Sequence, residues 1–127
     1  MKEIAFYLGV GALLTHELDA MTNHEWRVLP LVRALPDDIG TVVFVALHVP
    51  IFAGLIALLA SSNQQTRSLS RLGIGAFLVV HGFLHALLTG HPAYEFSSLM
   101  SRILIFGGAA LGGAYLVLEG ADRRAGR

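Results

Sequence analysis

Two histidines spaced four residues apart, His81 and His85, could do chemistry together, in a chain that holds six histidines and no cysteine. Residues at this spacing share one face of a helix, so both imidazoles can reach a single metal ion. His16 is the next choice of ligand and His48 the fourth. Because thiolate ligands are excluded, nitrogen and oxygen donors of this kind favour zinc, iron or manganese.

Two carboxylates stand close to the first of these histidines in the chain. Glu17 follows His16 directly, and Asp19 lies three residues after it, on the same helix face. Either acid could serve as a ligand or as a general base, so both are candidate catalytic residues. Four further polar residues belong to the same region of the predicted structure, and they are His24, Glu25, His91 and Arg102. Arg102 either extends its charge to the membrane surface or pairs with a nearby carboxylate.

The elements that would position these residues are four apolar stretches separated by polar breaks. They run over about residues 4–20, 41–60, 72–89 and 98–118. About 20 apolar residues are needed for a helix to cross the roughly 30 Å hydrocarbon layer of a bilayer. We therefore predict an all-α fold, a four-helix transmembrane bundle over residues 1–120, with a loose tail at 121–127. Thr22 and Glu25 have the spacing of a capping box, which allows a short interfacial helix between the first two helices.

Composition places the chain in the same class. Apolar residues make up 54% and charged residues only 14%, against roughly 25% charged residues in soluble domains. Nine basic residues balance nine acidic ones, so no basic surplus favours nucleic acid as a partner. The expected surrounding is the lipid bilayer. The GxxxG segment at residues 108–112 is predicted to be a packing face between helices.

The distribution of Lys and Arg predicts the orientation in the membrane. With four spans, one side carries six basic residues and the other three, which places both termini in the cytoplasm of a bacterial cell, with the chain in its inner membrane. In this topology every histidine falls in the outer half of the bilayer or in the two outer loops. The positions of the helices are predicted from hydropathy alone, yet they place the histidines at one depth in the membrane. This agreement is the strongest functional indication in the sequence.

The segment at residues 15–27, THELDAMTNHEWR, carries a resemblance to known proteins, together with LHVP around His48, the HxxxH pair and GHP around His91. Over nearly its whole length the chain resembles a family of small uncharacterised bacterial membrane proteins. It is more loosely similar to the HXXEE-domain membrane proteins, although Asp19 and Ala20 stand where that pattern has its two acids. The resemblance implies the architecture and the choice of residues, and it supplies no reaction.

Four functions remain open from the sequence. The leading one is a metal-binding membrane protein, with a metalloenzyme acting on a lipid-soluble or small periplasmic substrate as its most specific form. A second is haem ligation for electron transfer, with two of the four membrane histidines as axial ligands. A third is a proton-coupled carrier or accessory subunit, which at this size would work as a homo-oligomer. The fourth is a structural partner whose polar groups only hold helices together.

Overall fold

The computed structural model describes residues 1–126, and within that range every regular element is a helix. The elements in chain order are α1 (Lys2–Thr22), η1 (Glu25–Arg27), η2 (Val32–Ala34), α2 (Asp37–Leu59), α3 (Gln64–Leu88), α4 (Leu99–Arg102), the π-helical turn η3 (Ile103–Gly107) and α5 (Gly108–Ala125). The last three form one continuous helix of 27 residues. The all-α class is thus confirmed, with four long helices where four apolar stretches were predicted.

Two helices extend beyond their predicted bounds because polar side chains hold their ends. α3 begins at Gln64 rather than near residue 72, since the side chain of Asn63 caps it by accepting a hydrogen bond from the Thr66 amide at 3.0 Å. α5 continues to Ala125 through most of the segment predicted to be loose. There Arg123 pairs with Glu119 one turn earlier, at 2.8 Å. Arg127 lies outside the described residues.

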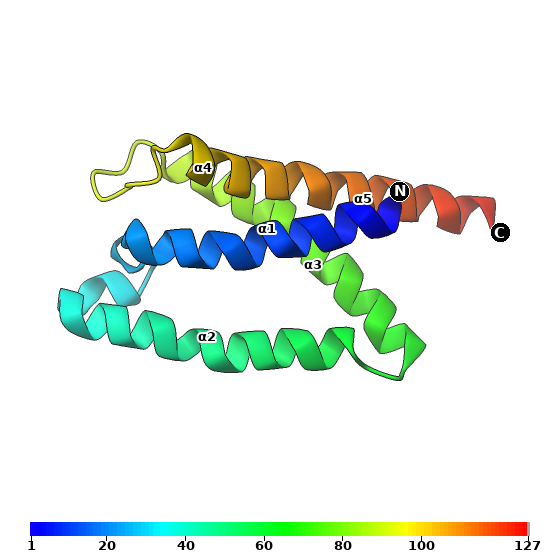
Figure 1. Ribbon diagram of the computed structural model, residues 1–127, viewed down its shortest axis with the longest axis horizontal. Coiled ribbons are helices and arrows are strands. Elements are labelled where there is room, and N and C mark those ends of the chain that lie inside the picture. Colours follow the sequence, from blue (N-terminus) through cyan, green and yellow to red (C-terminus); the bar gives the residue numbers. More distant parts are fainter. Residues whose placement is uncertain (127) are drawn as a thin grey trace.

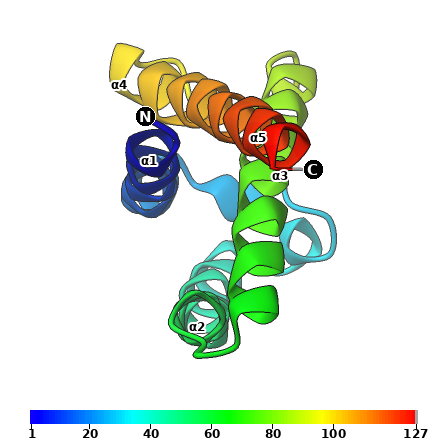
Figure 2. The ribbon, with the colours of Figure 1, turned by 90° about the vertical axis from the view of Figure 1, so that its right-hand side faces the viewer.

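Three of the long helices pack together and the fourth stands apart. α5 lies against both α1 and α3, whereas α2 contacts mainly α3 and the two 3₁₀ helices of the α1–α2 connection (Figures 1 and 2). The N-terminus and the C-terminal end of α5 lie at the same end of the molecule (Figure 1). The predicted short helix between the first two long helices is present as two single turns, η1 and η2.

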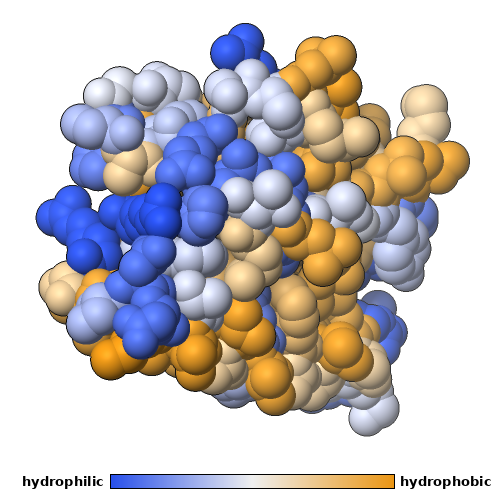
Figure 3. Space-filling model, turned by 60° about the vertical axis from the view of Figure 1, so that its left-hand side comes forward, coloured by the Kyte–Doolittle hydropathy of each residue, from blue (hydrophilic) through white to orange (hydrophobic). Residues whose placement is uncertain are grey.

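Three of the long helices have the length and composition of membrane spans. α2, α3 and the continuous α4–α5 helix are each long and apolar enough to cross a membrane. Large apolar side chains stand exposed on them, for example Val49, Phe83 and Val117. Figure 3 shows a broad apolar surface next to a hydrophilic cluster on the same face. Exposed apolar surface of this extent marks contact with lipid or with another protein.

Small residues let α3 and α5 approach closely. A Cβ atom built on Gly112 would lie 2.7 Å from the carbonyl oxygen of Gly75 and 2.7 Å from the Cβ of Leu78. One at Gly82 would lie 2.6 Å from the Cβ of Ala109. The GxxxG segment therefore lies in a helix contact, and the contact fixes α3 beside α5 near the two histidines of α3.

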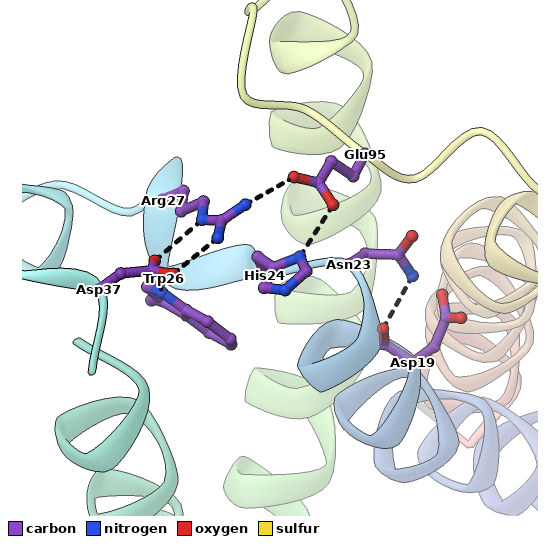
Figure 4. Close-up of polar contacts among 7 residues, drawn as sticks. All are labelled: Asp19, Asn23, His24, Trp26, Arg27, Asp37 and Glu95. Carbon is purple, nitrogen blue, oxygen red and sulfur yellow. Dashed lines mark hydrogen bonds and ion pairs between the residues drawn. The ribbon is translucent and has the colours of Figure 1, made fainter. Parts of the chain in front are cut away.

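A polar network joins the loops at the opposite end from the termini (Figure 4). Arg27 holds both oxygens of Asp37, at 2.9 and 2.6 Å, and one oxygen of Glu95, at 3.0 Å. His24 contacts the other oxygen of Glu95 at 2.8 Å, and the indole of Trp26 donates to Asp37 at 2.7 Å. The hydrogen bond with His24 and the one from Arg27 lower the pKa of Glu95. The network therefore ties η1 to the start of α2 and to the α3–α4 loop.

Replacing Arg27 with alanine is expected to loosen these loops, because one guanidinium serves both carboxylates. Amide hydrogen exchange in residues 24–36 and 90–97 should become faster, while exchange in α5 stays unchanged. Arg33→Ala is the matched control, because Arg33 is exposed and forms no ion pair within residues 1–126. Equal exchange in the two variants would show that the network does not hold the loops.

Candidate metal centre

Three histidines and one glutamate converge where α1, η1 and α3 meet. His16 comes from α1, Glu25 from η1, and His81 and His85 from α3. One ligand atom can be chosen from each residue so that all four atoms lie within 4.8 Å of one another. The Nε2 atoms of His81 and His85 are 3.1 Å apart. His16 Nε2 lies 3.4 Å from one Glu25 oxygen, and His85 Nε2 lies 3.5 Å from the other.

These separations match those between the ligands of a small divalent ion. Bonds of 2.0–2.2 Å to nitrogen or oxygen in a tetrahedral arrangement place neighbouring ligand atoms about 3.3–3.5 Å apart. The measured separations of 3.1, 3.4 and 3.5 Å lie close to this range. Three contacts therefore have the spacing of neighbouring ligands of one ion, and side-chain adjustment would bring the full set, which lies within 4.8 Å, to that spacing.

The cluster is buried, and part of it lacks hydrogen bonds. His16 is 1% exposed, His85 2% and Glu25 7%. Both ring nitrogens of His16 and Oε2 of Glu25 have no hydrogen-bond partner among residues 1–126. An unsatisfied buried polar group costs about 1–3 kcal/mol, so a protein retains such groups where something else satisfies them. A metal ion bound between these atoms would satisfy His16 Nε2 and Glu25 Oε2 together.

Local backbone geometry explains how Glu25 reaches the histidines. His24 adopts the left-handed conformation, with φ 49° and ψ 47°, which few non-glycine residues take. The chain turns sharply there, immediately after α1 ends, and the side chain of Glu25 points back to His16. On α3, the four-residue spacing places both histidines on the face that packs against α1 and η1.

Aromatic residues from α3 and from the α3–α4 loop surround the cluster. The Tyr94 hydroxyl contacts Nδ1 of His85 at 3.2 Å, which leaves Nε2 of that ring directed to the centre of the cluster. The ring of Phe96 packs edge-on against His85, with centroids 4.9 Å apart, and Phe77 stacks on His81 at 5.5 Å. Because these contacts restrict the rings, the cluster is positioned before any ligand binds.

The histidines also determine the charge of the glutamate. Burial would raise the pKa of Glu25, but its contacts with His16 and His85 lower it more strongly, to about 2. Glu25 is therefore an ionised carboxylate at neutral pH, the form that binds a cation.

Several other predicted residues lie outside the cluster. His48 instead contacts Glu17, with Nε2 and Oε2 at 2.8 Å. One carboxylate oxygen of Asp19 is buried without a hydrogen bond in the described chain, and the Asp19 carbonyl accepts from Asn23 at the end of α1. The remaining three act in or near the loops: His24 binds Glu95, His91 accepts from the Ala93 amide, and Arg102 is exposed on α4 without an ion pair in the part of the chain that is described.

Sequence reasoning places Glu25 with the other polar residues of the loops and not among the metal ligands. No periodic pattern links Glu25 to the histidines. The only signal for Glu25 is its type: an acid close in sequence to His16 in a chain with few charges.

The comparisons place the chain in a family without assigning it an activity. The chain belongs to a family of unknown function, DUF6713, whose model matches residues 2–122. No curated protein and no solved structure matches the chain.

Proposed function

We propose that this member of DUF6713 is an integral membrane protein that binds one divalent metal ion through His16, Glu25, His81 and His85. One observation carries the proposal: four buried nitrogen and oxygen ligands from three elements meet within 4.8 Å, and one of them, His16, has no other partner in the described chain. A buried histidine that only joined helices would be expected to form hydrogen bonds through its ring nitrogens, and His16 forms none within residues 1–126.

The same proposal places all four long helices across the membrane. α1 is flanked by the spanning helices α3 and α5, and α1, α3 and α5 form the packed part of the molecule. The start of α1 and the end of α5 lie at the same end of the molecule, as an even number of spans requires (Figure 1). The Lys and Arg distribution then supports a bacterial inner-membrane protein with both termini in the cytoplasm. The metal centre lies in the outer half of this bundle, close to the periplasm.

The ligands favour a single ion over haem. Three nitrogens and one carboxylate, with no thiolate, are the donors of zinc, iron and manganese sites. The ring centroids of His16, His81 and His85 lie within 5.0 Å of one another. Two axial ligands of a haem must stand on opposite faces of the macrocycle, and these rings leave no room for one between them. Bound with further coordination positions open, such an ion would supply Lewis-acid or redox chemistry, so we extend the proposal to a membrane metalloenzyme.

Metal analysis of the detergent-purified protein, with a glutamate variant, tests the site. We expect about one zinc, iron or manganese ion per chain, and Glu25→Gln should weaken its binding by about a hundredfold or more, because a neutral amide replaces an anionic ligand. Glu119→Gln is the matched control, because Glu119 is half-buried and pairs with Lys2 near the opposite end of the molecule. Protein that contains no metal after growth in supplemented medium, with an unchanged circular dichroism spectrum, would contradict the proposal.

A further inference from the structure

A second site lies next to the metal centre, in the space between α2 and the α1–α3 pair. It is a cavity of about 620 Å³, within the range of small-molecule sites. Its walls are almost entirely apolar and include Leu13 of α1, Ile51 and Leu55 of α2, and Ile74 of α3. Along α2 it extends from His48 to Leu58, which corresponds to about 15 Å of helix.

Glycines on both sides keep this cavity wide. Gly54 of α2 and Gly73 of α3 both line it, and a Cβ atom built on either residue would have no other atom within 4 Å. These positions therefore differ from Gly75 and Gly112, where helix packing leaves no space for a side chain. The open space belongs to the cavity and is not needed for the α3–α5 contact.

One polar pair interrupts the apolar lining. Glu17 Oε2 and His48 Nε2 lie 2.8 Å apart, and both residues line the cavity. His48 Nδ1 is 2.7 Å from the Phe44 carbonyl, which can only accept, so this nitrogen donates. Both nitrogens of His48 are thus engaged. Ser70 also lines the cavity, and its hydroxyl donates to the Thr66 carbonyl at 2.8 Å. Oε1 of Glu17, the carboxylate oxygen that does not pair with His48, forms no hydrogen bond within residues 1–126.

The chemistry of this atom selects the ligand. A hydroxyl group can donate to a carboxylate oxygen or accept from a carboxyl proton, so it complements Glu17 in either form. An ionised carboxylate head group can only accept hydrogen bonds, so it would complement Glu17 in the protonated form alone. An ammonium group would lose its hydration in an apolar cavity. A plain hydrocarbon would leave Oε1 without a partner.

We propose that this cavity binds a lipid-soluble alcohol, with its hydroxyl group at Glu17 and its hydrocarbon chain between α2 and α3. The cavity and the metal centre share a wall, because Phe77 lines the cavity and stacks on His81. His16 of the centre also directly precedes Glu17 in the chain. The inference rests on the proposed placement in the bilayer, from which such a molecule would enter, and it names the substrate class for the neighbouring metal centre.

Binding of dodecanol to the full chain in phosphatidylcholine nanodiscs tests this inference. Tritiated dodecanol should bind saturably, at about one molecule per chain above the uptake of empty nanodiscs. Glu17→Leu should weaken this binding about tenfold, which is the effect of one lost hydrogen bond. Binding of dodecane, which has no hydroxyl group, should be the same in wild type and Glu17→Leu.

A second variant blocks the cavity without touching the polar pair. Gly73 lines the cavity and a Cβ atom built on it meets no other atom within 4 Å, so Gly73→Phe should fold, fill part of the cavity and weaken the binding of both probes. The proposal is overturned if dodecanol is taken up without saturation, if Gly73→Phe binds it like wild type, or if the alcohol and the alkane bind equally well. In the last case the cavity holds ordinary lipid chains.

Metal content is measured on the same samples, so that the two proposals can be told apart. Alcohol binding by protein that contains no metal would contradict the metal centre alone. Bound metal without alcohol binding would contradict only this inference.

Discussion

Protein with both His81→Ala and His85→Ala is expected to lose its metal to background levels while it keeps its helical content. These residues supply two of the four proposed ligands, and their Nε2 atoms lie 3.1 Å apart. Four-ligand structural zinc sites contribute about 10–16 kcal/mol, so two ligands account for roughly 5–8 kcal/mol. That corresponds to a fall in affinity of about 10⁴-fold or more. Elemental analysis and a competition titration with a chelator of known affinity would measure it.

His48→Ala is the matched control for this variant. His48 also lies in a long helix and contacts a carboxylate, but its partner is Glu17 and it stands outside the cluster. This variant should retain the metal with nearly unchanged affinity. Retention of metal by the double variant, or its loss from His48→Ala alone, would mean that the ion is held elsewhere. A Soret band that disappears with the same histidines would replace the single ion with haem.

Gly112→Ala is expected to destabilise the helix bundle strongly for a change of one methyl group. The added Cβ would lie 2.7 Å from the Gly75 carbonyl oxygen and 2.7 Å from the Cβ of Leu78, so α3 and α5 would have to separate. Overpacking of this kind costs about 1–3 kcal/mol. Thermal unfolding in detergent, followed by circular dichroism, should show a lower midpoint than for wild type.

Gly120→Ala, in the same helix, is not expected to destabilise the protein. A Cβ atom there meets no other atom within 4 Å, and alanine is favoured over glycine in a helix by about 1 kcal/mol. Its midpoint should equal or exceed that of wild type. If both variants unfold at the same temperature, the close approach of α3 and α5 does not limit stability.

The two experiments are linked through the position of α3. Gly82, which packs against Ala109 of α5, lies between the two histidines of the pair. A shift of α3 away from α5 would also move the histidines relative to His16 of α1. Gly112→Ala should therefore reduce metal affinity as well as stability, whereas loss of metal ligands should leave the glycine contact intact.

Hydropathy and residue type determined the broad outline of this protein. Four apolar stretches correspond to the four long helices, and three of these helices are long and apolar enough to span a membrane, because the length and continuity of an apolar run are local properties of the sequence. The four-residue spacing of His81 and His85 likewise places both on one face of α3, since helical periodicity is a local property. Hydropathy does not predict the exact ends of α3 and α5, because these ends depend on a cap at Asn63 and on an ion pair of Arg123.

Only the tertiary structure decided which polar groups meet. His16 and His48 are both histidines, and the topology predicted from the sequence places them at a similar depth in the membrane. In the structure His16 joins the histidine pair on α3, whereas His48 contacts Glu17. The difference depends on the rotation of each helix about its axis, which is set by packing between helices and not by hydropathy. Glu25 joins the cluster because the chain reverses at His24 in a left-handed conformation. The sequence thus determined which side chains were available, and the packing of α1, α3 and the intervening loop determined that three histidines and this glutamate share one site.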